Sequence, residues 1–398
     1  MTAKSMKPYI QGNSAIRAMF EEGARMAKEV GAENVYDFSL GNPSVPAPKE
    51  VEQAIKDILA EEASTFIHGY NQSNSGYDDV REVVARHLNR LHGTWFTSKN
   101  IIMTVGAAGG LNVAMKTLLD PGDEVLAFAP YFVEYGNYAA NHGAVLKAVP
   151  ADTETFMPNL KKLEEMISEK THAVIINSPN NPTGVVYSEM TLKKLAAILS
   201  KKEKEFGHDI FIISDEPYRE LVYDGVKVPY VTSFYKNTIV GYSWSKSLSL
   251  PGERIGYLVI PSEADDFDDL FTAANIANRV LGFVNAPTLM QRVAARCIKC
   301  TTDIAAYDKN RQALYGGLMK AGYECIKPEG AFYLFVKSPI EDDKEFCRMA
   351  KNHNILVVPG SSFACPGYVR IAYCVSYDTI INSLPGFKAL MEEINGNE

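Results

Sequence analysis

The chain has 398 residues, a length that corresponds to roughly two to three domains of ordinary size. Hydrophobic residues make up 46% and charged residues 22%, which is typical of a globular protein and excludes a chain that is disordered throughout. With 40 Lys and Arg against 48 Asp and Glu, the net charge of −8 disfavours nonspecific binding to nucleic acid.

The N-terminal segment, residues 1–47, is predicted to be an extended arm that carries one amphipathic helix and forms part of a smaller domain. The helix runs from Ala15 to Val30, and Gly31 is its C-cap. The first residues lack the apolar stretch of a secretory signal, and no run in the chain approaches the ~18 apolar residues of a membrane span. We therefore expect a cytoplasmic protein that does not bind membranes.

Between about residues 100 and 260, short β-branched runs alternate with longer helix-compatible segments. Because the runs are apolar on both faces, they indicate a mainly parallel sheet flanked by helices, within a large α/β domain at 48–290. The predicted helices lie at 109–119, 160–168 and 190–205. The predicted strands lie at 101–104, 124–128, 173–177, 210–214, 238–242 and 257–260.

The C-terminal third, residues 291–398, is predicted to form the rest of the smaller α+β domain. Its apolar runs are 331–336, 355–359 and 368–373. Cys297 and Cys300 form a single C-x-x-C pair. A structural zinc needs four ligands, so we interpret this pair as a coincidence and predict no metal site. Six scattered cysteines also do not form a disulfide framework, which agrees with a reducing compartment.

The segment SWSKS at 243–247, followed by GERIGY at 252–257, carries the strongest chemical signal. A partly desolvated lysine such as Lys246 forms imines with carbonyls. Ser243, Ser245 and Arg254 are residue types that bind phosphate. Together they point to an aldehyde cofactor that bears a phosphate. The alternative is a polar surface loop after a core strand.

The segment SDEPYREL at 214–221 follows an apolar strand, so Asp215 is expected at the carboxyl end of that strand, where ligands bind in open α/β sheets. A carboxylate there can hold a protonated ring nitrogen, and Tyr218 can donate to a phenolate oxygen. The alternative is a helix N-cap at Asp215, with Tyr218 packed in the core.

Three further segments fit the same ligand. Asn181 lies in the turn NSPNNPTG at 177–184, which could also be an ordinary strand-to-helix turn. TVGAAGG at 104–110 ends a strand and begins a helix, whose free N–H groups favour anions, although such glycines also serve close packing. Arg370 lies in the strand YVRIAY and needs an anionic partner, either a substrate carboxylate or an internal Asp or Glu.

Four of these blocks, SPNNPTG, SDEPY, SWSKS with GERIGY, and YVRIAY, occur in the order and spacing of one family. Over nearly its whole length the chain resembles the pyridoxal-phosphate-dependent aminotransferases of fold type I, in the class I/II superfamily that includes aspartate aminotransferase. The resemblance implies the cofactor pyridoxal 5′-phosphate (PLP). It also implies transfer of an amino group from an L-amino acid to a 2-oxo acid through an aldimine on Lys246.

By this resemblance, Lys246, Asp215 and Tyr218 are the catalytic residues. Asp215 pairs with the pyridinium nitrogen, Asn181 and Tyr218 contact the ring oxygen, and Gly41 and Arg370 hold the substrate carboxylate. Tyr131 stacks on the ring, and Tyr70 reaches the phosphate of a neighbouring subunit, which requires a homodimer with shared active sites. The residues implied around the phosphate are Gly106, Ala107, Ala108, Ser243, Ser245 and Arg254. Ala107 and Ala108 stand where many members have hydroxyls or a lysine.

The same residues would also serve a C–S lyase or an amino-acid decarboxylase, and a noncatalytic sensor module is a remote alternative. We lean toward aspartate or another common amino acid as donor. Arg279 could read a distal carboxylate in the partner's site, or it could be an exposed helix arginine. Of the two tryptophans, Trp244 is expected under the cofactor and Trp95 in the core.

Overall fold

The computed structural model describes residues 2–11 and 15–396. Its largest sheet has seven strands in the order β2-β8-β7-β6-β5-β3-β4. Only β8 runs antiparallel to its neighbours. The strands are β2 (Ile101–Thr104), β3 (Glu124–Phe128), β4 (Val145–Val149), β5 (Thr171–Asn177), β6 (Phe211–Asp215), β7 (Thr238–Ser243) and β8 (Gly256–Val259).

All six runs predicted in this region are strands, and the sheet is mainly parallel, as expected. The sequence reading missed β4, whose side chains are mostly half-exposed at the edge of the sheet, so it lacks the continuous apolar run of a buried strand.

Alternate residues of the central strands enter two different cores. In β5, Ala173 and Ile175 pack with one cluster, whereas Val174 and Ile176 pack with another. This period of two places helices on both faces of the sheet. The helices of this part are α3 (Lys49–Glu61), α4 (Ser64–Ile67), α5 (Asp78–His92), α6 (Gly106–Leu118), α7 (Tyr135–Ala140), α8 (Leu160–Met166), α9 (Glu189–Phe206), α10 (Trp244–Ser247), α11 (Phe267–Val280) and α12 (Thr288–Arg296).

A smaller antiparallel sheet has the order β12-β13-β10-β9. The predicted run 355–359 divides into two strands of different sheets, because β11 pairs with β1 near the N-terminus while β12 pairs with β13. This pairing joins the N-terminal part of the chain to its C-terminal part in one region, as the sequence predicted. The elements are α1 (Lys7–Gln11), α2 (Ala15–Val30), β1 (Tyr36–Asp37), α13 (Ile304–Lys320), β9 (Glu324–Cys325), β10 (Tyr333–Lys337), α14 (Asp343–Lys351), β11 (Ile355–Leu356), β12 (Val358–Pro359), β13 (Tyr368–Ala372) and α15 (Tyr377–Gly396).

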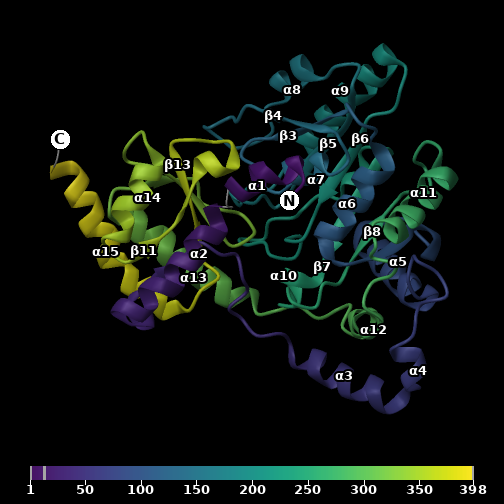
Figure 1. Ribbon diagram of the computed structural model, residues 1–398, viewed down its shortest axis with the longest axis horizontal. Coiled ribbons are helices and arrows are strands. Elements are labelled where there is room, and N and C mark those ends of the chain that lie inside the picture. Colours follow the sequence, from purple (N-terminus) through teal and green to yellow (C-terminus); the bar gives the residue numbers. More distant parts are fainter. Residues whose placement is uncertain (1, 12–14, 397–398) are drawn as a thin grey trace.

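Figure 1 shows α2 and α13 to α15 gathered around the small sheet on one side and the seven-stranded sheet on the other, with α3 and α4 at the lower edge of the molecule. The domain boundaries after residues 47 and 290 stay predictions. Within the described residues, no helix is both long and apolar enough to cross a membrane. The six cysteines are unpaired.

One of the two tryptophans does not lie where the sequence placed it. Trp95 is 90% exposed, so its assignment to the core was wrong. It lies in the irregular segment between α5 and β2, where no apolar neighbour covers it. Trp244 is buried, but its ring packs edge-on against Tyr242 and Tyr257, with centroids 5.5 and 5.2 Å away. It therefore contributes to the hydrophobic core of the large sheet.

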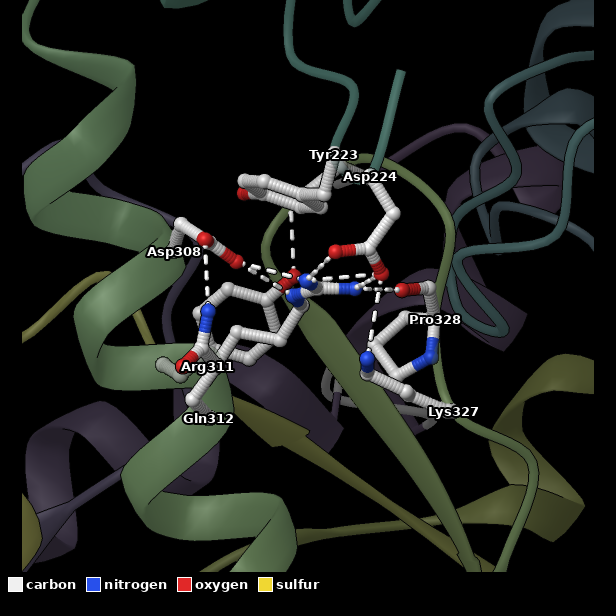
Figure 2. Close-up of polar contacts among 9 residues, drawn as sticks. Tyr223, Asp224, Asp308, Arg311, Gln312, Lys327 and Pro328 are labelled. Carbon is white, nitrogen blue, oxygen red and sulfur yellow. Dashed lines mark hydrogen bonds and ion pairs between the residues drawn. The ribbon is translucent and has the colours of Figure 1, made fainter. Parts of the chain in front are cut away.

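An ion-pair cluster around the buried Arg311 joins α13 to the segment that follows β6 (Figure 2). The guanidinium of Arg311 is fully buried; it donates to Asp224 at 3.0 Å, to Asp308 at 2.8 Å and to the carbonyl of Pro328 at 2.8 Å. Its face lies 4.4 Å from the ring centroid of Tyr223. All polar sides of this buried cation therefore have partners, which is the condition for its burial.

Backbone hydrogen bonds extend this connection to the start of β10. The Tyr223 amide donates to the Glu329 carbonyl, and the Ala331 amide donates to the Leu221 carbonyl, each at 2.9 Å. The segment that leads into β10 is thus fixed against the segment that leaves β6. This attachment sets where the small sheet lies relative to the end of β6.

We expect Arg311→Met to lower the free energy of unfolding by about 1 to 2 kcal/mol, because the carbonyl of Pro328 loses a donor and the partly exposed carboxylates of Asp224 and Asp308 lose a partner. Urea titration followed by circular dichroism measures this loss. Arg25→Met, which removes an exposed ion pair, is the matched control and should shift the midpoint little. A loss no larger than that of the control would contradict a stabilising role for the cluster.

Candidate active site

One cavity of about 740 Å³ collects most of the residues that the sequence singled out. It lies where β5, β6 and β7 end, between the large sheet and the small one. Those of the predicted residues that line it are Gly41, Ala107, Ala108, Asn181, Asp215, Tyr218, Ser243, Ser245, Lys246, Arg254 and Arg370.

The parallel direction of the strands accounts for this convergence. Asp215 is the last residue of β6 and pairs in register with Asn177, the last residue of β5. The Asn177 side chain donates to the Asp215 carbonyl and accepts from the Asn181 amide, each at 2.7 Å. Asn177 thus ties the turn that carries Asn181 to the end of β6. The sequence analysis did not assign it a role.

The carboxylate of Asp215 is buried with only one of its oxygens partnered. Oδ2 accepts from the Tyr135 hydroxyl at 2.6 Å, whereas Oδ1 has no partner. Burial raises the pKa of Asp215 to about 7, and the hydrogen bond from Tyr135 opposes this rise. A buried carboxylate oxygen without a donor favours a ligand that brings a positively charged N–H to it.

Lys246 lies in α10, and its ammonium donates to the carbonyl of Gly41 at 2.6 Å. Its Nζ is 5.2 Å from the ring centroid of Phe332. Burial lowers the pKa of Lys246 to about 8, and the positive charges of Arg370 and Arg254 lower it further. A larger fraction of neutral amine at neutral pH makes this lysine a better nucleophile and base.

An anion-binding corner lies at the start of α6. The hydroxyls of Ser243 and Ser245 are 2.5 Å apart, and the guanidinium of Arg254 donates to the Pro251 carbonyl at 2.9 Å. Gly106 has φ +68°, and a Cβ there would lie 2.9 Å from Nη2 of Arg254. The left-handed φ favours glycine where α6 begins beside the guanidinium, with its free N–H groups nearby.

Arg370 is buried in β13, yet its partners in the described part of the chain are neutral. It donates to the Ser39 carbonyl at 2.6 Å and to the Asn181 side chain at 3.1 Å, while Nε has no partner. Its face stacks on Tyr333 at 4.6 Å and on Phe363 at 4.9 Å. The internal Asp or Glu that the sequence left open is not found there, so the guanidinium favours an anion from solution.

Three predicted residues lie outside the cavity lining. Gly106 lies directly behind Arg254. Tyr131 does not line the cavity; its ring stacks on Tyr135 with centroids 6.3 Å apart, and the next residue, Phe132, lines the cavity instead. Tyr70 is 88% exposed, three residues beyond the end of α4. Sequence position alone could not decide which aromatic side chain of the APYFVEY segment enters the cavity.

The model of the family described as "Aminotransferase class I and II" matches residues 33–382 of this chain. The chain belongs to the class I and II aminotransferase family. Its fold and its enzyme class, an aminotransferase, follow from this membership and agree with the resemblance inferred from the motifs.

Similar proteins carry aminotransferase names. A probable aspartate/prephenate aminotransferase of Thermus aquaticus is 31% identical over 98% of both chains. The crystal structure of an amino transferase from Eubacterium rectale is 50% identical, with a TM-score of 0.97 and 99% of both chains covered. Aspartate aminotransferase from Thermotoga maritima is 28% identical, with a TM-score of 0.86, covering 98% of this chain and 100% of that one.

The lowered pKa of the half-buried Lys246 predicts a cost in stability when no small molecule is bound. Its pKa falls from 10.5 to about 8, so keeping it charged at pH 7 costs about 3 kcal/mol. Lys246→Met also removes the hydrogen bond to Gly41, worth about 1 kcal/mol. We therefore expect the ligand-free variant to be more stable than wild type at pH 7 by about 2 kcal/mol.

The sign of this difference depends on pH. Between about pH 8 and 10.5, the unfolded chain binds more protons than the folded one, so wild-type stability rises with pH and the advantage of the variant shrinks. Urea unfolding at pH 7 and pH 10 measures both values. Lys388→Met, at an exposed helix position, is the control and should show no such trend. A destabilised Lys246→Met at pH 7 would contradict the lowered pKa.

Proposed function

We propose that this aminotransferase binds PLP in the cavity and moves an amino group from an L-amino acid to a 2-oxo acid. The observation that carries the proposal is that one cavity presents both a lysine of lowered pKa and a buried carboxylate oxygen without a partner. PLP supplies an aldehyde and a protonated ring that accepts electrons from the substrate Cα.

The residues present fit such a group at each of its polar ends. Oδ1 of Asp215 is free to accept from the ring nitrogen. Tyr218 and Asn181 line the cavity beside it and are assigned to the ring oxygen. We assign the stacking aromatic to Phe132 rather than Tyr131, because Phe132 lines the cavity. The phosphate is assigned to the anion-binding corner formed by Gly106, Ala107, Ala108, Ser243, Ser245 and Arg254.

The substrate α-carboxylate is assigned to Arg370 and Gly41. A guanidinium can grip a carboxylate through two parallel hydrogen bonds, and Nε of Arg370 is a buried donor without a partner. Lys246 is then placed to take a proton from Cα and return it, since a base held in position acts without diffusing to its substrate.

We propose a homodimer with shared active sites as the working unit. Tyr70, assigned to the phosphate of the partner, is exposed in the single chain, as are Leu59 and Phe66 nearby on α3 and α4. These helices lie at the lower edge of the molecule in Figure 1, available to a second copy.

The visible absorption spectrum of the purified enzyme, titrated with single amino acids in the absence of a 2-oxo acid, tests the function. We expect a cofactor band that requires Lys246 and that bleaches with a few donors, aspartate among them, because the cofactor retains the amino group. Lys246→Ala should lose both the band and the bleaching. Consumption of the amino acid with an unchanged band would instead favour the lyase or decarboxylase reaction. Absence of any band after PLP is added would contradict the proposal.

Arg279, at the end of α11, provides a test of donor specificity. Its side chain is exposed in the single chain, so it can take part in a distal carboxylate site only across the dimer. If it does, Arg279→Ala raises KM for aspartate about tenfold or more, while KM for a donor with a neutral side chain is unchanged. Steady-state kinetics with both donors measure this. An unchanged KM for aspartate leaves Arg279 as an exposed helix residue.

A further inference from the structure

Tyr333, in β10 of the small sheet, lines the active-site cavity and has no role in the function proposed above. Its side chain is buried, and its hydroxyl lies 2.9 Å from the hydroxyl of Tyr218. From the sequence, its segment is predicted only as a strand. Two phenols in contact, one of them assigned to the cofactor ring oxygen, form a chain that leads from the small sheet to the reaction centre.

The Tyr333 ring is held on several sides. Its hydroxyl lies against the backbone of Gly41 so closely that a Cβ there would be 2.0 Å from the oxygen. Arg370 stacks on the ring at 4.6 Å, and Phe332 packs against it with centroids 5.0 Å apart. Because these contacts restrict rotation of the phenol, its hydroxyl stays directed toward Tyr218.

The direction of the hydrogen bond follows from the number of protons available. A tyrosine hydroxyl has one proton. If Tyr218 donates that proton to an oxygen in the cavity, its own oxygen can only accept, and Tyr333 must be the donor between the two phenols. Burial raises the pKa of Tyr333 to about 12, so it keeps its proton at neutral pH. Consecutive hydrogen bonds of this kind polarise and strengthen one another.

We propose that Tyr333 is a positioning residue. It donates a hydrogen bond to Tyr218 and thereby keeps the hydroxyl proton of Tyr218 directed toward the ring oxygen of bound PLP. This inference rests on the proposed function. The small sheet then influences the proton affinity of the bound cofactor, in addition to supplying Arg370 for the substrate carboxylate. The backbone of Gly41 packs against the Tyr333 hydroxyl and keeps it in place. The carbonyl of the same residue accepts a hydrogen bond from Lys246.

The pH titration of the visible band of the holoenzyme tests this inference, with wild type, Tyr333→Phe, Tyr218→Phe and the double variant compared. Weaker donation to the ring oxygen disfavours its anionic form, so the titration midpoint rises. We expect Tyr333→Phe to raise it by about 0.3 to 1 pH unit, a roughly twofold to tenfold change in proton affinity. Because Tyr333 acts through Tyr218, the double variant should match Tyr218→Phe alone.

Tyr323→Phe is the matched control. Tyr323, between α13 and β9, is also a buried phenol beside the small sheet. Its hydroxyl donates one hydrogen bond, to the Phe387 carbonyl at 2.8 Å, and its side chain does not line the cavity. Its loss should leave the midpoint unchanged. If the midpoint of Tyr333→Phe is unchanged, with or without a raised KM, the inference is overturned. It is also overturned if the shift in the double variant is the sum of the two single shifts. If wild type shows no band, the proposed function itself fails.

Discussion

The carboxyl ends of the parallel strands β5, β6 and β7 lie at the same end of the large sheet, and the arrangement of the cavity depends on that alignment. Each strand delivers its last polar residue to the same place: Asn177, Asp215 and Ser243. Since the strands are buried on both faces, their register is fixed by packing on two sides. Groups distant in sequence therefore converge without any flexible loop having to position them.

The cavity holds charges and dipoles that the chain itself leaves incompletely paired. Oδ1 of Asp215 and Nε of Arg370 are buried without a partner, and the half-buried amine of Lys246 has a lowered pKa. A site assembled only for stability would pair these groups with one another. Their arrangement instead leaves room for the cofactor and the substrate carboxylate proposed above, at the expense of stability in the ligand-free protein.

The small sheet contributes more than a cover for the cavity. The Arg311 cluster and the backbone hydrogen bonds beside it hold the segment before β10 against the segment after β6. From that anchor, β10 brings Tyr333 to Tyr218, and its neighbour β13 brings Arg370 to Asn181. The large and small sheets thus meet through side chains that touch the same cavity.

The sequence by itself determined six of the seven strands of the large sheet, the α/β class, and the residue types of the site, because apolar runs and strand-end motifs are local patterns. It could not decide between a substrate anion and an internal carboxylate at Arg370, between Phe132 and Tyr131 at the cavity wall, or whether Trp95 is buried. It also gave no sign of Tyr135 and Tyr333, since a tyrosine looks the same in sequence whether it packs or donates. Those choices depend on which side chains meet across distant segments, and only the tertiary structure decides that.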